Sequence, residues 1–93
     1  MLCMAHTFHH RKKLLTRVRR IKGQAEALER SLEKEDDCFD ILQQIASVRG
    51  AINGLLAEVI EGHVEEHIAR VKDERTRQKG ADELMKILRS YIK

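Results

Sequence analysis

Residues 36–67 read DDCFDILQQIASVRGAINGLLAEVIEGHVEEH, and this stretch decides the fold of the chain. Its apolar residues recur at steps of three and four, which is the spacing of one face of an α-helix. They are Ile41, Leu42, Ile45, Val48, Ile52, Leu55, Leu56, Val59 and Ile60. Asp36 and Asp37 supply N-cap carboxylates just before the pattern begins. The stretch therefore predicts one long amphipathic helix that extends to His67.

Three side chains on this predicted helix carry metal-ligating atoms, a thiol near its start and two imidazoles near its end. Cys38 precedes His63 by 25 residues and His67 by 29 residues. At about 100° per residue both imidazoles point within about 20° of the thiol's direction, but at about 1.5 Å per residue the thiol lies about 37 Å from His63. A second copy that runs antiparallel would place its thiol beside these imidazoles. We therefore predict an obligate antiparallel dimer with two equivalent metal sites, each built from both chains.

Length and composition limit the class of protein. The 93 residues are expected to form one domain, residues 1–93, that alone buries only about 60–65% of its unfolded surface. The chain has no proline or tryptophan and only three aromatic residues, which favours an all-α fold. It has no apolar run of about 20 residues and no signal-peptide pattern, so we expect a cytoplasmic protein without membrane contact. Two distant cysteines then indicate metal ligands or reactive thiols rather than a disulfide.

A second amphipathic pattern predicts a helix from about Arg11 to Glu33. Its apolar residues are Leu14, Val18, Ile21, Ala25, Leu28 and Leu32. The first half of this helix is strongly basic. No acidic residue occurs between Arg11 and Glu26, and the basic residues there are Arg11, Lys12, Lys13, Arg17, Arg19, Arg20 and Lys22. Positive charge near a helix N-terminus opposes the helix dipole, so helix stability alone does not explain the basic residues.

Four residues of this basic segment share one helical face by their spacing: Lys13, Arg17, Arg20 and Gln24. A concentrated basic face that a dimer displays at least twice favours binding to nucleic-acid phosphates. The alternative interpretation is a solvated basic face without a ligand. No helix-turn-helix, zinc-finger or aromatic RNA-binding motif accompanies these residues. The sequence thus predicts a polyanion as partner without specifying a base sequence.

The N-terminal residues 1–10, MLCMAHTFHH, show no helical periodicity and are expected to form a mobile arm. Met4 is an alternative start to Met1. A chain that starts at Met4 would lack Cys3 and, once the methionine is removed, would carry a free amine next to His6.

The C-terminal third of the chain predicts a loop and a short helix. Residues 70–79 are polar and charged and are expected to form a loop or a frayed helix extension, with Gly80 as a helix breaker. A third helix from about Ala81 to Tyr91 is expected to pack on the core, because it is too short to be stable alone.

One thiolate and two imidazoles form a donor set that suits zinc, copper, nickel or cobalt better than magnesium or calcium. The predicted metal ligands are therefore Cys38, His63 and His67. His6 from the arm would raise the coordination number, and six ligands favour nickel or cobalt over zinc, which prefers four. Nearby carboxylates that can serve as further ligands or support the ligands are Glu66 and Asp37. The alternative interpretation is that the cysteine is a small apolar residue and the histidine pair is unrelated to it.

The segment His63-Val64-Glu65-Glu66-His67 also fits the H-x-x-E-H pattern of inverzincin metallopeptidases. The chain is too small to build a protease cleft around it, so we interpret the protein as a non-enzyme.

Two further features of the long helix leave alternatives open. Gly50 and Gly54 are either tolerated in a long helix or allow another helix to approach closely. Arg49 lies in the stripe that bears the predicted ligands and requires a polar partner, for which Asn53 or a carboxylate across an interface is a candidate.

Three segments are identified as characteristic of the CsoR/RcnR family of bacterial transcriptional repressors, and the resemblance extends from Met4 to Lys93. They are TRVRRIKGQ at 16–24, LQQIA at 42–46 with RGAINGL at 49–55, and SYIK at 90–93. The resemblance implies a three-helix protomer, an antiparallel dimer that forms a four-helix bundle, and a dimer-of-dimers tetramer. It also implies that the apo-protein binds double-stranded operator DNA and that an effector releases it to induce an efflux or detoxification gene.

The resemblance also assigns effector residues one by one. Cys38 and His63 match the cysteine and histidine that the family shares. The next position, cysteine in copper sensors and commonly glutamate in formaldehyde sensors, is His67 here. His6 matches the N-terminal histidine of nickel–cobalt sensors. This set resembles the nickel–cobalt branch, with Ni(II) or Co(II) as effector and Zn(II) or Cu(I) as alternatives.

Two departures and two alternatives accompany this assignment. The additional Met1-Leu2-Cys3 changes the position of the N-terminal amine, and a second-position proline typical of formaldehyde sensors is absent. A formaldehyde-responsive repressor that uses Cys38 as its reactive thiol is the runner-up. A helical adaptor whose basic face binds an acidic protein is a further alternative. In the DNA-binding role, Arg17 and Arg20 match the family's basic positions, and Lys13 and Gln24 lie on the same face.

Overall fold

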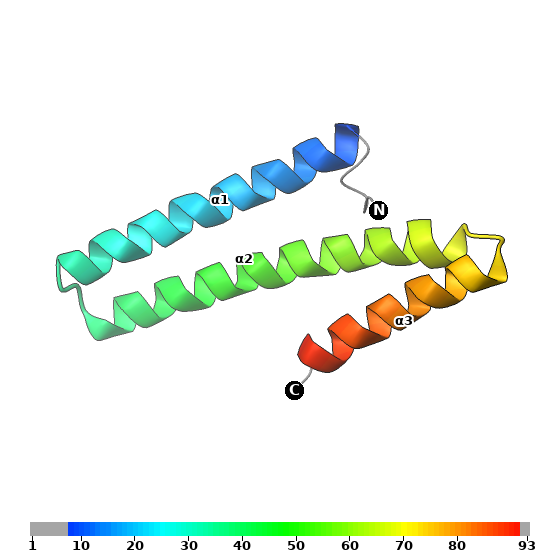
Figure 1. Ribbon diagram of the computed structural model, residues 1–93. Coiled ribbons are helices and arrows are strands. Elements are labelled where there is room, and N and C mark those ends of the chain that lie inside the picture. Colours follow the sequence, from blue (N-terminus) through cyan, green and yellow to red (C-terminus); the bar gives the residue numbers. More distant parts are fainter. Residues whose placement is uncertain (1–7, 92–93) are drawn as a thin grey trace.

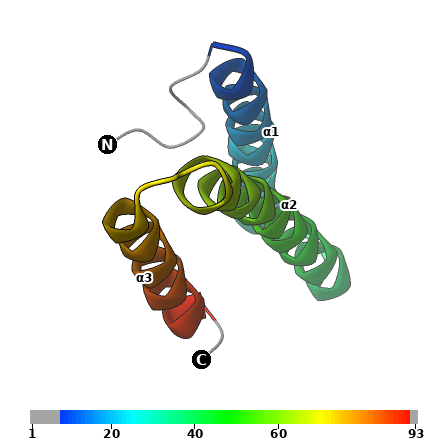
Figure 2. The same ribbon diagram turned by 90° about the vertical axis from the view of Figure 1, so that its right-hand side faces the viewer.

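The computed structural model describes residues 8–91 and contains three long helices (Figure 1). α1 spans Phe8–Glu33, α2 spans Cys38–Val64, a π-helical turn η2 spans Glu65–Ala69, and α3 spans Glu74–Tyr91. α1 and α2 form an antiparallel hairpin, and Figure 2 shows α2 between α1 and α3. No strand occurs within residues 8–91, so the predicted all-α fold and three-helix protomer are confirmed.

The start of α2 is the start that the sequence predicts. Asp37 is the N-cap residue, and its carboxylate accepts a hydrogen bond of 3.2 Å from the backbone N–H of Phe39. The end of α2 differs from the prediction, because regular α-helix stops at Val64 and the chain continues as a π-helix. In that turn the N–H of Arg70 donates to the carbonyl oxygen of Glu65 at 3.2 Å, five residues back. His67 therefore lies on the π-helical turn rather than on α2.

The turn between α1 and α2 closes with a Schellman motif. The N–H of Asp36 donates to the carbonyl of Ser31 at 3.0 Å, and the N–H of Glu35 donates to that of Leu32 at 3.2 Å. Glu35 has a φ of 57°, the left-handed conformation that this motif requires and that glycine adopts most easily.

Replacing Glu35 with glycine is expected to stabilise the chain by about 0.5–1 kcal/mol, because the left-handed backbone costs about 1–2 kcal/mol for a residue with a Cβ, part of which the greater backbone entropy of glycine offsets. Thermal unfolding followed by circular dichroism measures the change. Lys34→Gly is the matched control at a position without a positive φ, and it should not stabilise. A lower melting temperature for Glu35→Gly would contradict the Schellman geometry.

Two of the helices, α1 and α3, begin earlier in the chain than the sequence predicts. α1 begins at Phe8 rather than Arg11, because no glycine or proline interrupts the helix before that residue. Residues 8–10 of the predicted arm are thus helical, and the rest of the arm lies outside the described residues. α3 begins at Glu74 rather than Ala81.

The early start of α3 has a local cause in Asp73. Its carboxylate accepts hydrogen bonds from the N–H of Thr76 at 2.9 Å and from the hydroxyl of Thr76 at 2.7 Å, which caps the helix. The hydroxyl bond is the main cause that lowers the pKa of Asp73. The predicted loop therefore shrinks to residues 70–73.

Gly80 does not break the helix, and that prediction is wrong. The residue is buried within α3. A Cβ built on Gly80 would overlap the carbonyl oxygen of His67 and lie 3.1 Å from the Cβ of His67. The missing side chain thus lets α3 pack directly against the backbone of η2, which is a use of glycine that a local sequence pattern does not reveal.

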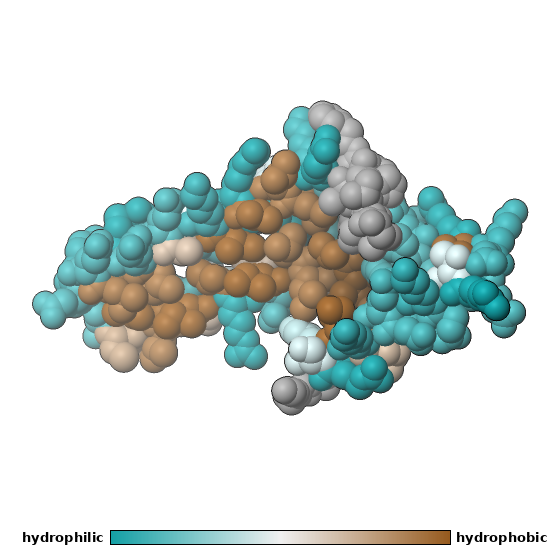
Figure 3. Space-filling model, in the orientation of Figure 1, coloured by the Kyte–Doolittle hydropathy of each residue, from teal (hydrophilic) through white to brown (hydrophobic). Residues whose placement is uncertain are grey.

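The single chain is flat and leaves much apolar surface exposed. Its extents are 55 × 32 × 15 Å, and its radius of gyration is 17.0 Å, where a compact chain of this length has about 12 Å. Figure 3 shows an apolar band that runs along α1 and α2 on one face. Among the residues whose exposure the structure describes, ten large apolar side chains are exposed: Leu15, Val18, Leu32, Phe39, Leu42, Ile45, Ile52, Met85, Ile87 and Tyr91. Within residues 8–91, no helix is both long and apolar enough to cross a membrane.

Candidate functional site

The two predicted imidazole ligands lie side by side at the C-terminal end of α2. His63 is in the last turn of α2 and His67 is in η2. Their ring centroids are 4.9 Å apart with an angle of 42° between the ring planes, and both residues are half-buried. The i,i+4 spacing therefore places the two imidazoles next to each other, although the backbone changes from α- to π-helical between them.

A hydrogen bond to α3 orients the ring of His63. Nε2 of His63 lies 2.8 Å from the carbonyl oxygen of Gly80. A carbonyl only accepts, so Nε2 carries the hydrogen and donates, and in the neutral ring the lone pair is on Nδ1. A metal-ligating histidine commonly has its second ring nitrogen held in this way. His63 thus fits a role as a metal ligand through Nδ1.

Cys38 is the first residue of α2 and is exposed, as a free thiol. α2 extends for 27 residues between the cysteine and the end that bears His63. At about 1.5 Å per residue the two side chains are separated by about 37 Å within one chain. The structure therefore brings the two imidazoles together and leaves the thiol at the opposite end of the helix.

The remaining predicted ligands have different surroundings. Among residues 8–91 of one chain, no three His, Cys, Asp or Glu side chains gather closely enough to hold a metal ion. Asp37 caps α2, and Glu66 is half-buried in η2 beside His67. His6 lies outside the described residues.

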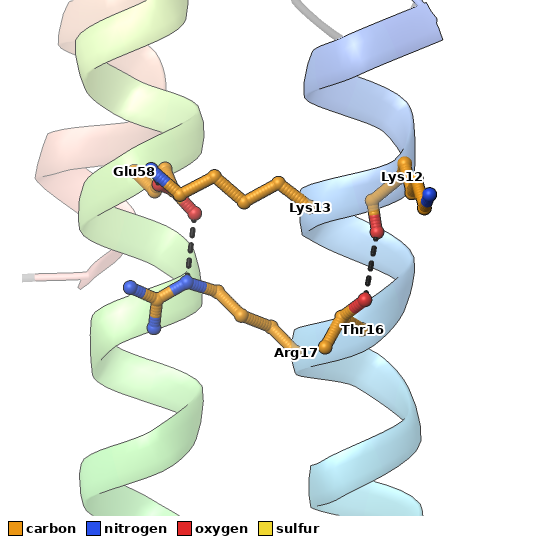
Figure 4. A network of polar contacts seen from close by, with 5 residues as sticks. All are labelled: Lys12, Lys13, Thr16, Arg17 and Glu58. Atoms are coloured by element: carbon orange, nitrogen blue, oxygen red, sulfur yellow. Dashed lines mark hydrogen bonds and ion pairs between the residues drawn. The ribbon is translucent and has the colours of Figure 1, made fainter.

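The basic face of α1 is turned partly toward α2. The Lys13 ammonium and the Arg17 Nε each lie 2.7 Å from a different carboxylate oxygen of Glu58 on α2 (Figure 4). About two turns further along α1, the Gln24 side-chain amide donates to the hydroxyl of Ser47 at 3.1 Å. Arg20 is exposed. Three of the four predicted phosphate contacts thus also connect α1 with α2.

Glu58 is a functional candidate that the sequence analysis did not select. Its side chain is only 13% exposed. Hydrogen bonding from Lys13 holds the pKa of Glu58 below its ordinary value, and the charges of Lys13 and Arg17 act in the same direction, although burial opposes them. One feature of the sequence could have identified it: Glu58 is the single carboxylate in the apolar segment Leu55–Ile60. A carboxylate that is buried in such a segment requires a cationic partner.

The two glycines of α2 differ in their surroundings. A Cβ on Gly54 would lie 3.2 Å from the Nη1 of Arg17, whereas a Cβ on Gly50 would meet nothing within 4 Å. Close approach is therefore observed at Gly54, by an arginine rather than by another helix. Arg49 lies at a shallow apolar hollow between α1 and α2, and its suggested partner Asn53 accepts a hydrogen bond of 3.1 Å from the Tyr91 hydroxyl.

Comparison with known proteins gives one consistent result. Residues 10–90 match the family model described as metal-sensitive transcriptional repressor. The transcriptional repressor RcnR of Salmonella paratyphi B is 47% identical over 90 residues, which cover 97% of this chain and 100% of that protein.

Two solved structures share the fold. A glutamate-to-histidine variant of the formaldehyde-responsive regulator FrmR from Salmonella enterica serovar Typhimurium has a TM-score of 0.86 and 47% identity, and the match covers 92% of this chain and 98% of that one. The copper-sensing repressor CsoR with Cu(I) from Geobacillus thermodenitrificans has a TM-score of 0.87 and 25% identity, with 94% and 91% covered.

Proposed function

This chain belongs to the metal-sensitive transcriptional repressors of the CsoR/RcnR family, and from that premise we propose that it represses an efflux gene until nickel or cobalt releases it from operator DNA. Proteins of this family are transcriptional regulators and not enzymes. We place its action in the cytoplasm, where a repressor meets DNA. The observation that supports the metal response best is the adjacent pair His63 and His67, with a thiol at the other end of the same helix.

The proposed effector site needs two chains. Cys38 of one chain and the two histidines of the other would provide one sulfur and two nitrogen ligands, a set that suits nickel, cobalt, zinc or copper. His6 is the proposed fourth protein ligand. A further ligand, such as the N-terminal amine or Glu66, would raise the coordination number above four, and this favours nickel or cobalt over zinc. Glu66 and Asp37 are proposed to support the ligands.

The exposed apolar surface supports assembly with further copies. The single chain exposes 7417 Å², whereas a folded monomer of its mass typically exposes about 5,500 Å². Leu42, Ile45 and Ile52 form an exposed apolar stripe on α2. An antiparallel second copy would cover this stripe and bring each thiol to the histidine end of its neighbour. We propose that two such four-helix dimers form the tetramer.

The proposed DNA surface is the basic half of α1, with Lys13, Arg17, Arg20 and Gln24 as contacts. Phosphate contacts by lysine and arginine give an affinity that falls steeply with salt. A metal ion held by Cys38 of one chain and by His63 of the other would fix α2 of both chains, and α1, which packs on α2, would then take a position that fits DNA less well. DNA must then weaken metal binding by the same factor.

Titration of the anaerobic apo-protein on operator DNA tests this function. Operator duplexes are first selected from random sequences by repeated rounds of binding to the apo-protein. Nickel or cobalt should weaken operator binding by a factor of about 5–150, the usual range of allosteric coupling. Zinc and copper(I) are titrated in parallel. Unchanged operator affinity with all four metals would contradict the metal response.

A formaldehyde-responsive repressor remains the second candidate, because the Cys38 thiol is exposed and a formaldehyde-responsive regulator shares 47% of the sequence. In this case Cys38 attacks formaldehyde and a nearby amine closes a methylene bridge with loss of water. Formaldehyde rather than metal would then release the operator, and mass spectrometry would find a cross-link at Cys38.

A further inference from the structure

Glu58 engages the Lys13 ammonium and the Arg17 Nε, two groups that a DNA phosphate would also use if these residues contact DNA. We propose that Glu58 is an internal competitor for phosphate, which weakens the binding of the repressor to DNA of arbitrary sequence. The proposal deepens the proposed function and depends on its assignment of Lys13 and Arg17 to the DNA surface.

The geometry makes Glu58 the shared anion of both cations. Its Oε1 lies 2.7 Å from the Lys13 ammonium and its Oε2 lies 2.7 Å from the Arg17 Nε (Figure 4). Only 13% of the Glu58 side chain is exposed, whereas the two cationic side chains are 55% and 40% exposed. The carboxylate is therefore withdrawn from solvent while both cations remain accessible to an incoming polyanion.

The absence of a side chain at Gly54 leaves room for the guanidinium of Arg17 beside α2. A Cβ at Gly54 would lie only 3.2 Å from the Nη1 of Arg17, so the guanidinium rests on the α2 backbone one turn before Glu58. Because the Arg17 Nε lies at Glu58 and its Nη1 lies near Gly54, the side chain reaches across from α1 to α2 (Figure 4).

Carboxylate and phosphate oxygens compete for the same N–H donors. In the free protein one negative charge offsets two positive charges, which weakens the attraction for any polyanion. To bind Lys13 and Arg17, a DNA duplex must either share these two cations with Glu58 or displace Glu58 from them, in every chain that it contacts. This cost is the same for every sequence, but a cognate operator makes further contacts and stays tightly bound, whereas DNA of arbitrary sequence becomes a weak ligand.

The test compares Glu58→Gln with Glu65→Gln in the metal-free full-length protein. Glu65 lies 2.6 Å from Arg70, which is not on the proposed DNA surface, so both variants remove one ion-paired carboxylate and the same charge. Glu58→Gln should bind a mixed-sequence duplex about threefold to tenfold more tightly than Glu65→Gln, and should elute from heparin at higher salt. Operator affinity should rise by a similar factor, because phosphate contacts are common to every DNA sequence.

A double-mutant cycle shows that the effect acts through the two cations. In a chain with Lys13→Gln and Arg17→Gln, adding Glu58→Gln should leave heparin elution and duplex affinity unchanged relative to that chain. Equal heparin elution of Glu58→Gln and Glu65→Gln would overturn the proposal.

Heparin separates failure of this inference from failure of the proposed function. If no operator is selected, the repressor function fails, but the heparin comparison still tests Glu58 against Glu65. If Glu58→Gln does not fold, carbon-13 NMR of the unmodified protein replaces it. The Glu58 carboxylate signal should shift when heparin is added, because the two cations leave it, and an unchanged signal would contradict the proposal.

Discussion

Replacement of Gly80 with alanine is expected to displace α3 and to destabilise the chain by about 3 kcal/mol, at the upper end of overpacking effects. The added Cβ would overlap the carbonyl oxygen of His67 and lie 3.1 Å from the carbonyl carbon of that residue. These are backbone atoms of η2, so no side-chain rotation relieves the overlap and a helix has to move. A loss of this size lowers the melting temperature by more than about 10 °C in a domain of this length, and thermal unfolding measures it.

Gly23→Ala and Gly50→Ala are the matched controls for Gly80→Ala. A Cβ at either position meets nothing within 4 Å in the chain, and both residues are in helix interiors. Each substitution should stabilise by up to about 1 kcal/mol through helix propensity. An unchanged melting temperature for Gly80→Ala would show that α3 does not pack on the η2 backbone as described.

Gly80→Ala should also affect the effector site. The carbonyl of Gly80 is the acceptor that holds Nε2–H of His63 at 2.8 Å, and displacement of α3 removes that acceptor. His63 would then lose its fixed tautomer and orientation. Loss of the hydrogen bond that holds a metal-ligating histidine commonly weakens metal binding 10- to 100-fold, an effect of about 1.4–2.7 kcal/mol. Cobalt binding to the variant, measured below its unfolding temperature, tests this consequence.

The long helix was predictable because local signals determine it. The apolar stripe of residues 41–60 and the cap at Asp37 depend on neighbours in the sequence, and the structure has both. Gly80 shows the limit of local signals. Glycine destabilises a helix interior, but it also permits close packing, and only the position of His67 on a different element decides between the two.

The candidate site also contains one contact that local spacing predicts and one that it does not. The contact between His63 and His67 follows from their spacing on one helix and is observed. The partner of Lys13 and Arg17 was not predicted, because Glu58 is more than 40 positions away in the sequence and the pairing depends on how α1 packs on α2. The clustering of the cations identified them, and the single carboxylate in the segment 55–60 indicated that Glu58 needs a cationic partner when it is buried, but neither pattern shows that the two belong together.

Mixing two inactive variants is expected to restore metal binding if the site is built from two antiparallel chains. Cys38→Ala lacks the thiol of the proposed site, and the double variant His63→Ala/His67→Ala lacks its two imidazoles, so neither should form the proposed site when it is pure. In a mixed dimer, the cysteine of the second chain meets the histidines of the first and forms one intact site. With random pairing, about a quarter of the wild-type sites should return.

The sulfur-to-cobalt charge-transfer absorption reports this recovery, because it requires a thiolate and the metal in one site. The control mixes Cys38→Ala with a chain that carries all three substitutions, which leaves no intact site in any pairing. Arg17→Ala, by contrast, should bind cobalt normally and lose operator affinity. Within one chain about 37 Å of helix separates the thiol from His63, so a single chain has no route to recovery. Absence of the absorption band from the mixed dimers would therefore exclude the antiparallel site, and with it the proposed coupling between metal and DNA.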